Sequence, residues 1–387
     1  MILALYFMEN QKLTICFLGS AESIHTLKWA QYFADKKHNV HLISYEPLLK
    51  GYNPGDIKLY FLKKKIPTQI WPLNTLLNLP LTLLRVKTLI KKIKPDIINA
   101  HYVTSYGTLA ALLGFHPLII TAWGSDILVT PKKFPPCKWS VKYALKKADL
   151  ITCDAEHMKK AMTKFGVPAS KIRIINFGID TQRFSPGPKN KELKERLGIS
   201  EKKIIISLRS LYPIYDIETI IKAAPFVLKE YPKTIFIIAG EGFQENELKN
   251  LAKELNVSGS IKFVGFIPNE ELPDYLRTAD VYVSTSLSDA GIAASTAEAM
   301  TCGLPVVITD TGENRKWVKN GENGFLIPVK NPEILAEKII YLLKNENIAK
   351  ELGRKNRKII EERNDYCKEM AKMEEIYYSL LKNKKYE

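Results

Sequence analysis

The feature that most constrains the fold is a rhythm in which short apolar runs alternate with longer amphipathic stretches. A first series of apolar runs lies at residues 13–18, 39–44, 96–100, 117–122, 150–153 and 172–176. A second series lies at residues 203–208, 234–239, 261–264, 281–285 and 305–309. The stretches at 23–37, 73–94, 217–229 and 246–255 have helical periodicity. This alternation is typical of parallel sheets built from strand–helix units. The sequence therefore predicts an α/β protein with two doubly wound domains.

The two series are separated by a stretch rich in Pro, Gly and Lys at residues 184–191. A chain of 387 residues exceeds the size of one ordinary core, and domain boundaries fall in segments of this composition. We therefore predict an interdomain linker at this stretch.

Positive charge is concentrated in the first half of the chain. Residues 1–183 contain 26 Lys and Arg against 11 Asp and Glu, whereas the remainder contains 31 against 30. Such asymmetry predicts an anionic partner for the first half: a membrane surface, a phosphorylated acceptor or nucleic acid. No RNA-binding, helix-turn-helix or zinc-binding pattern supports nucleic acid, so we do not expect it as a partner.

Cysteine usage indicates a reducing compartment, and hydropathy argues against a membrane span. The five cysteines are scattered and do not form a zinc-binding spacing. No apolar run reaches the length of about 18 residues that a membrane span needs. We expect a cytoplasmic protein, free or attached to the inner face of the membrane, with neither a disulfide framework nor a bound metal.

Unusual residues stand at strand ends in the second half, where parallel sheets bind ligands. Arg209 follows the first apolar run, and a hydroxyl-rich loop at 284–292 leads into a helix of very small residues. Small side chains at a helix start allow a diphosphate to approach the backbone N–H groups. One turn further, Glu298 is an acceptor suited to ribose hydroxyls. Close helix–sheet packing would explain the small residues equally well, and a cap or surface charge would explain Glu298.

In the first half, three strand ends carry polar or small residues. Gly19 and Ser20 end the first strand, His101 follows a buried run, and Asp126 follows the next run through a Gly-Ser pair. Polar residues at such ends are more often functional than the same residues on helix faces.

Several ordered motifs resemble glycosyltransferase family 4, the retaining GT-B enzymes. They are IIAGEG (237–242), FVGFIPNEEL (263–272), AEAMTCGLPVV (297–307) and NGENGFLIPVKNPEILAEKI (320–339), with INFGIDTQRFSP (175–186) at the interdomain crossover. The resemblance runs over the whole chain and is strongest between residues 171 and 339.

The resemblance implies a GT-B fold, in which two Rossmann-like domains face each other across a cleft. It implies an N-terminal acceptor-binding domain at 1–183, joined by a C-terminal helix at about 364–387, and a donor-binding domain at 184–363. A UDP-, GDP- or ADP-sugar would be the donor, and a lipid-linked, polysaccharide or glycolipid intermediate the acceptor. Transfer would retain the anomeric configuration and need neither metal nor cofactor.

Site roles carried over by position are as follows. Arg209 would bind the diphosphate, Glu298 the ribose, and Phe266 would lie near the base. Gly19 and Ser20 match the glycine-rich donor loop. Asp126, with His101 second, would orient the sugar or the acceptor hydroxyl. Backbone contacts to the donor would come from Ile292, Ala293 and Ala294.

Three positions depart from the family pattern. The first acid of its E-x7-E motif falls on Ala290, with Asp289 one place earlier. Either the loop is shifted so that Asp289 binds the donor sugar in its place, or that contact is missing. The lysine after its arginine falls on Tyr215, and a histidine that contacts the sugar falls on Trp123. These departures leave open a nucleotide-binding module without transfer activity. A pyridoxal phosphate phosphorylase of similar fold would need a Schiff-base lysine environment that is not evident.

The leucine-rich segment 72–94 ends in lysines and has two interpretations. It could lie on an anionic membrane, or be an ordinary core helix with a solvated tip. A membrane or a phosphate-rich acceptor best explains the basic residues of this half, namely Lys63, Lys64, Lys65, Lys91, Lys92, Lys94, Lys132 and Lys133.

Overall fold

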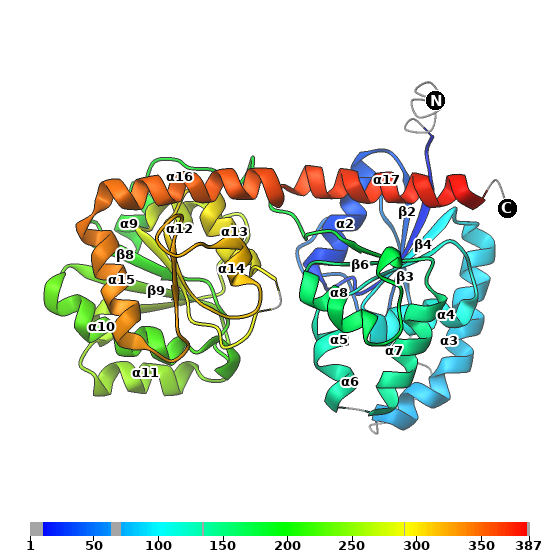
Figure 1. Ribbon diagram of the computed structural model, residues 1–387, viewed down its shortest axis with the longest axis horizontal. Coiled ribbons are helices and arrows are strands. Elements are labelled where there is room, and N and C mark those ends of the chain that lie inside the picture. Colours follow the sequence, from blue (N-terminus) through cyan, green and yellow to red (C-terminus); the bar gives the residue numbers. More distant parts are fainter. Residues whose placement is uncertain (1–10, 63–70, 134, 290, 385–387) are drawn as a thin grey trace. The chain divides into compact units, whose positions relative to one another are not determined.

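A computed structural model of the chain describes residues 11–62, 71–133, 135–289 and 291–384. The chain forms two compact units, residues 1–177 with 368–387 and residues 178–367. Each unit is built around one parallel sheet flanked by helices (Figure 1). The predicted α/β architecture of two doubly wound domains is confirmed.

The first unit contains a seven-stranded sheet in the order β3-β2-β1-β4-β5-β6-β7, and every neighbouring pair is parallel. Its strands are β1 (Thr14–Leu18), β2 (Asn39–Ser44), β3 (Lys58–Phe61), β4 (Ile97–His101), β5 (Leu118–Thr121), β6 (Leu150–Cys153) and β7 (Ile172–Ile174). Six of them coincide with predicted apolar runs to within two residues at each end. The edge strand β3 escaped prediction because its sequence, KLYF, is short and half exposed.

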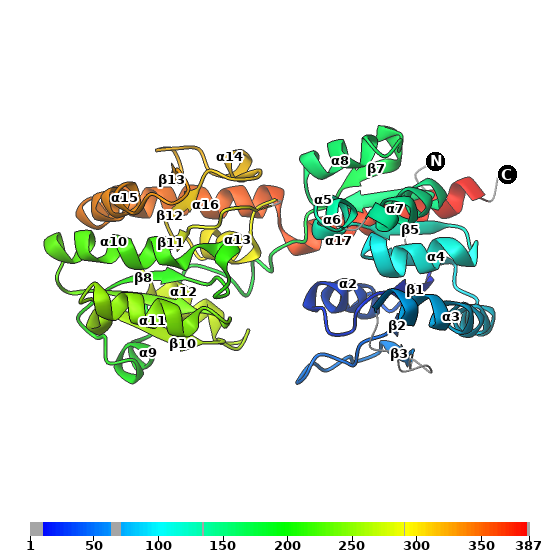
Figure 2. The same cartoon turned by 90° about the horizontal axis from the view of Figure 1, so that it is seen from below.

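Helices cover both faces of this sheet. The larger apolar cluster packs α3 (Trp71–Ile93), α4 (Thr108–Leu113), α7 (Pro135–Lys147) and α8 (Glu156–Thr163) against one face. The opposite face carries α2 (Ile24–Asp35) and the last helix, α17 (Tyr366–Lys384), where the ring of Tyr377 stacks on Phe33 of α2 at 4.8 Å. Figure 2 shows α2 and α3 on opposite sides of β1 and β2. No helix in the described part of the chain is long and apolar enough to cross a bilayer.

The second unit contains a six-stranded parallel sheet in the order β10-β9-β8-β11-β12-β13. Its strands are β8 (Lys203–Ser207), β9 (Thr234–Ala239), β10 (Ile261–Gly265), β11 (Val281–Ser284), β12 (Val306–Thr309) and β13 (Phe325–Ile327). One face packs against α10 (Ile217–Glu230), α11 (Glu245–Glu254) and α15 (Pro332–Lys344). On the other face, Tyr282 of β11 hydrogen-bonds Ser295 at the start of α13 (Ala294–Thr301). The remaining helices are α9 (Lys191–Arg196), α12 (Leu272–Thr278), α14 (Asn314–Trp317) and α16 (Glu346–Arg363).

The predicted linker at 184–191 is wrong, because this stretch is an integral part of the second unit. Phe184 is buried in it, and the Arg277 guanidinium donates hydrogen bonds to the carbonyl oxygens of Arg183 and Ser185. The division between the units falls instead between Phe177 and Gly178, and again between Cys367 and Lys368. A composition rich in Pro and Gly therefore marks a surface segment here rather than a domain boundary.

Candidate active site

Each sheet has one point at which the strand order reverses. It lies between β1 and β4 in the first unit and between β8 and β11 in the second. At such a point the loops at the carboxyl ends of the two strands diverge and leave room for a ligand. The residues found there are Gly19 and His101 in the first unit, and Arg209 and Asp289 in the second.

Arg209 lies just beyond β8 and is held from two sides. Its Nη2 atom donates a 2.7 Å hydrogen bond to Oδ1 of Asp289, and its Cζ atom lies 4.4 Å from the centre of the Tyr215 ring. The side chains of Arg209 and Asp289 are only 11% and 8% exposed. Nε of Arg209 is buried and has no hydrogen-bond partner within the described residues. Shielding from water strengthens the Coulomb attraction between these two charges.

Hydrogen bonds between two loops place Asp289 beside Arg209. The Thr285 hydroxyl, just after β11, donates to the Asp216 carbonyl oxygen at 2.8 Å. The Leu287 amide donates to the Ile214 carbonyl oxygen, also at 2.8 Å. The loop that follows β11 is thereby tied to the loop that follows β8.

Two glycines after β9 allow a third loop to approach Arg209. A Cβ atom on Gly240 would lie 2.5 Å from the Arg209 carbonyl oxygen, and one on Gly242 would overlap the Leu211 carbonyl oxygen. Gly240 also has φ of +145°, a region that side chains disfavour. The AGEG motif therefore shapes the backbone that carries Arg209.

The start of α13 is open, as the small residues suggest. Ala293 stands at its N-cap and no side chain caps the helix. Ala293 and Ala294 are half-buried and Ile292 is buried. Glu298, one turn further, is buried as well, which excludes the surface-charge explanation of this residue. Ala290 lies outside the described residues.

Exposed aromatic rings gather at neighbouring strand ends in the second unit. Phe266 follows β10 and is 70% exposed. Phe243 follows β9 and is similarly exposed, and its ring meets that of Tyr212, in the loop after β8, at 5.4 Å. Sequence reasoning found Phe266 but not the other two, although each follows an apolar run within a few residues.

In the first unit, Gly19 is required by packing. A Cβ atom there would lie 2.8 Å from Cγ2 of Thr26 and 3.2 Å from Cβ of His101. The absence of a side chain therefore lets the loop after β1 sit directly against α2 and the end of β4. Ser20 is half-buried, and its hydroxyl accepts a hydrogen bond from the Glu22 amide at 3.3 Å.

His101 is buried in an aromatic cluster. Its Nδ1 lies 3.2 Å from the Thr26 hydroxyl oxygen, and its ring meets the edges of Trp29 and Trp123 at 5.2 and 5.5 Å. Nε2 is buried without a hydrogen-bond partner among the described residues. Burial lowers the pKa of His101 to about 3, so the ring is neutral near pH 7.

Asp126 is fully buried and its carboxylate is occupied by the backbone. Its oxygens accept hydrogen bonds from the amides of Val103, Trp123 and Gly124, at 2.8, 3.2 and 2.9 Å. Burial raises the pKa of Asp126, and these amide hydrogen bonds oppose the shift. In this structure Asp126 holds the loop that presents Trp123. Its contact with sugar or acceptor stays a prediction.

Trp123 forms a stack that sequence reasoning did not foresee. The His25 ring lies against it at 5.1 Å with an interplanar angle of 28°. Burial, reinforced by the nearby Lys28, lowers the pKa of His25 to about 4. The departure from the family pattern at Trp123 thus creates a half-buried aromatic surface beside His101.

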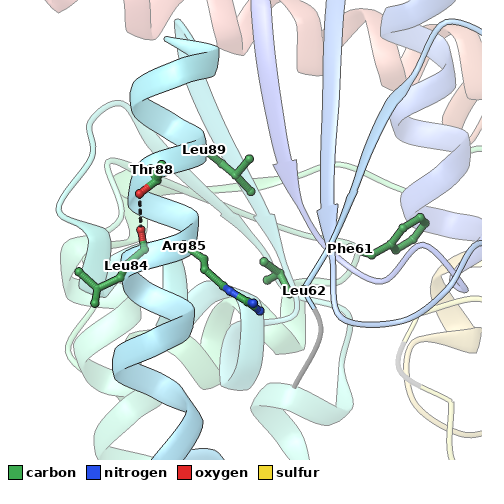
Figure 3. A pocket seen from close by; sticks show the side chains of 6 residues that line it. All are labelled: Phe61, Leu62, Leu84, Arg85, Thr88 and Leu89. Atoms are coloured by element: carbon green, nitrogen blue, oxygen red, sulfur yellow. Dashed lines mark hydrogen bonds between the residues drawn. The ribbon is translucent and has the colours of Figure 1, made fainter. Parts of the chain in front are cut away.

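An apolar groove lies elsewhere on the first unit, between β3 and α3. It has a volume of about 490 Å³ and is lined by Phe61, Leu62, Leu84, Arg85, Thr88 and Leu89. The Arg85 side chain extends from α3 toward Leu62, and the Thr88 hydroxyl donates to the Leu84 carbonyl oxygen at 2.9 Å (Figure 3). None of the predicted site residues lines this groove.

Metal ligands are a separate question. Among the residues that the structure describes, no group of three or more His, Cys, Asp or Glu side chains is arranged to hold a metal ion. The expectation of metal-independent chemistry stays a prediction.

The two units match two different protein-family models. A family model for glycosyl transferases group 1 matches residues 189–359, and one for glycosyl transferase 4-like proteins matches residues 14–155. An Escherichia coli enzyme, UDP-Gal:alpha-D-GlcNAc-diphosphoundecaprenol alpha-1,3-galactosyltransferase, is 24% identical over 93% of this chain and 94% of its own length. A GDP-mannose-dependent alpha-(1-6)-phosphatidylinositol monomannoside mannosyltransferase of Mycolicibacterium smegmatis is 25% identical over 64% of this chain and 66% of its own length.

Solved structures share the whole fold. Anabaena HepE, crystallised with UDP and glucose, superposes with a TM-score of 0.80 at 20% identity, covering 95% of this chain and all of that one. The two family models together cover most of both units, and the fold is shared with that structure. The chain is therefore a GT4-type glycosyltransferase of GT-B fold, and its second unit matches the glycosyl transferases group 1.

Proposed function

We propose that this protein transfers a hexose from a nucleoside diphosphate sugar to a lipid-linked or saccharide acceptor, with retention of anomeric configuration. The observation that carries the proposal is the position of Arg209. It lies at the strand-order reversal of the second unit, close to a loop that leads to the uncapped start of α13. A guanidinium and free helix-start amides are the groups that stabilise a leaving diphosphate.

The identity of donor and acceptor is inferred from the relatives. The Escherichia coli relative is named for UDP-galactose and a diphosphoundecaprenol acceptor, and the Mycolicibacterium relative for GDP-mannose and a phosphatidylinositol mannoside. Both acceptors combine a lipid, a phosphate and a sugar. The excess of Lys and Arg in residues 1–183 suits such an anionic acceptor.

A thermal-shift screen with UDP, GDP, ADP and their sugar conjugates tests the donor site. A ligand at about one hundred times its dissociation constant adds roughly 2.7 kcal/mol of stability. We expect one nucleotide family to raise the melting temperature of the wild type and to lose most of this effect in Arg209→Ala. Arg196→Ala, which removes an exposed guanidinium on α9, serves as the matched control. The absence of any shift at millimolar concentration would exclude a working donor site.

Retention is tested separately from binding. The product formed with the best nucleotide sugar is examined by proton NMR for the anomeric configuration of the new linkage. We expect the configuration of the donor. An inverted product would contradict the proposed stereochemistry and leave the donor assignment intact.

We further propose that the first unit docks on an anionic lipid surface. Helix α7 exposes Trp139, at 77%, and Tyr143 beside Lys138, Lys142 and Lys146. Helix α3 exposes Leu81 and Leu84 on the side that also carries Lys87 and Lys91, while its inner face packs into the core. Both helices contact α4 within the unit. Aromatic and apolar side chains interleaved with lysines are typical of surfaces that lie at the lipid headgroups.

Vesicle sedimentation tests this surface. We expect the protein to sediment with phosphatidylglycerol vesicles, to remain free with phosphatidylcholine vesicles, and to lose binding in Trp139→Ala and Leu84→Glu. Phe226→Ala, on α10 of the second unit, removes an exposed aromatic ring elsewhere and should leave binding unchanged. Equal binding to both lipids, or no effect of the two α7 and α3 substitutions, would exclude this docking mode.

A further inference from the structure

Arg209 is enclosed by two side chains at which this sequence departs from the family pattern. Tyr215 stands where the family has a lysine, and Asp289 stands one place before the position of its first acid. The structure brings both onto the same guanidinium, with Tyr215 on its face and Asp289 at its edge. The inference below rests on the proposed function, since it takes Arg209 to bind the diphosphate.

The charge of Arg209 is already matched before a donor binds. Asp289 lies 2.7 Å from Nη2, and the pair is largely withdrawn from water. A diphosphate that approaches Arg209 meets the negative charge of Asp289 at the same edge. Two anionic groups sharing so small a site repel each other, so both cannot hold the guanidinium equally well.

Asp289 has a second hydrogen-bond partner. The uncharged ring of Tyr215, in contrast, does not compete with an anion for the positive charge of Arg209. Nδ2 of Asn314 lies 3.4 Å from Oδ2 of Asp289, so the carboxylate keeps a hydrogen-bond donor if it leaves Arg209. The Tyr215 ring attracts the guanidinium through its face and does not neutralise it. Nε of Arg209 is buried and lacks a hydrogen-bond partner within the described residues, so the guanidinium retains unused hydrogen-bonding capacity.

We propose that Tyr215 is a positioning residue that holds Arg209 in place while the diphosphate of the donor replaces Asp289 as its anionic partner. In the empty site Asp289 is the counter-ion of Arg209. In the occupied site the diphosphate takes that place, Asp289 turns to Asn314, and Tyr215 keeps the guanidinium stacked. The ring thereby fixes the position of Arg209 at a site where the family pattern has both an arginine and a lysine.

The first test removes the counter-ion. Binding of inorganic pyrophosphate, UDP and GDP to the full chain is measured by calorimetry for wild type and Asp289→Asn. We expect the dissociation constant of the best ligand to fall roughly tenfold, because a competing charge is lost while the shape is kept. Glu351→Gln, in an exposed ion pair with Lys355 on α16, changes the net charge equally and should have no effect. Weaker binding in Asp289→Asn would show that Asp289 supports the bound diphosphate, and would overturn the exchange.

The second test asks whether Tyr215 acts through Arg209. Tyr215→Phe keeps the ring and should bind as the wild type does, whereas Tyr215→Leu should bind roughly fivefold more weakly. In the Arg209→Ala background, Tyr215→Leu should have no further effect, because the group it positions is gone. An equal loss in both backgrounds would indicate a purely structural role and overturn the proposal. Circular dichroism confirms that each variant is folded. If Tyr215→Leu is unfolded, Tyr215→Met removes the ring in its place and is judged by the same two comparisons.

Failure of the inference and failure of the donor site give different results. If the wild type binds none of the three probes, or Arg209→Ala binds them unchanged, the donor-site assignment fails and the inference with it. If Arg209→Ala weakens binding but the two tests above give the opposite outcome, the donor site stands and only the exchange is excluded.

Discussion

Asn99 on β4 and Tyr377 on α17 meet across 278 positions of the sequence: the Asn99 amide Nδ2 donates a 2.8 Å hydrogen bond to the Tyr377 hydroxyl oxygen. Both side chains are fully buried. The side-chain oxygen Oδ1 of Asn99 in turn accepts a hydrogen bond from the Thr121 hydroxyl, whose oxygen accepts one from the Thr152 hydroxyl. A polar chain thus runs across three strands of the first sheet and ends on the last helix.

Because of this polar chain of hydrogen bonds, removal of the Tyr377 hydroxyl should lower the stability of the first unit. In Tyr377→Phe the Asn99 amide is left buried without its partner, which should lower the free energy of unfolding of the first unit by about 1–3 kcal/mol. Chemical denaturation followed by a probe in that unit measures the loss, since two units need not unfold in one step. Tyr378→Phe is the control. The Tyr378 hydroxyl donates a hydrogen bond to the Gln11 carbonyl oxygen at the exposed surface, so its removal should change stability by less than about 0.5 kcal/mol. Equal effects of the two substitutions would contradict the prediction.

A methyl group at Gly240 should disturb Arg209, the arginine that we propose binds the diphosphate. The added Cβ would press on the Arg209 carbonyl oxygen, and φ of +145° strains any side chain. We expect Gly240→Ala to weaken binding of the preferred nucleotide at least tenfold, as seen by calorimetry. Gly259→Ala is the control, because a Cβ atom there has no heavy atom within 4 Å among its neighbours. Unchanged binding in Gly240→Ala would show that the AGEG turn does not set the pose of Arg209.

Acid should destabilise the attachment of α17. Hydrogen bonds from His38, at 3.1 Å, and from Tyr32 lower the pKa of Glu374 below its ordinary value. Because the pKa is lower in the folded state, the unfolded state binds more protons in acid, so stability is lost as pH falls. The loss should begin below about pH 5, near the unfolded value of a Glu carboxyl, and continue through the lowered folded pKa.

Glu374→Gln isolates this contribution. The variant should be less stable than the wild type near pH 7 and should show a shallower loss of stability between about pH 5 and pH 3. Equilibrium denaturation at several pH values gives both curves. Parallel curves for the two proteins would mean that another group causes the acid sensitivity.

Transfer should not depend on a divalent metal. In the proposed reaction, Arg209 and the amides at the start of α13 would carry the charge of the leaving diphosphate, which is the task that a metal performs in other enzymes. We expect millimolar EDTA to leave the initial rate of NDP release unchanged. A rate that is abolished by EDTA and restored by Mg²⁺ or Mn²⁺ would contradict this.

Much of the fold follows from local pattern. The alternation of apolar runs and helical stretches located six strands of the first sheet and five of the second, because a buried parallel strand must be apolar along its whole length. It missed β3 and β13, which are short and lie at sheet edges. It also misjudged residues 184–191, where burial of Phe184 is a property of the folded unit and leaves no mark in composition.

The sequence by itself determined which residues stand at the carboxyl ends of strands, because that depends only on where each apolar run stops. Arg209, His101 and Gly19 were found in this way, whereas Asp289 was singled out through the family resemblance. What only the tertiary structure decided is which of these side chains meet. Arg209 and Asp289 are 80 positions apart, and their pairing requires β8 and β11 to be neighbours and their loops to be tied together. The polar contacts of Asp126 likewise depend on where the backbone of Val103 passes, which no local pattern encodes.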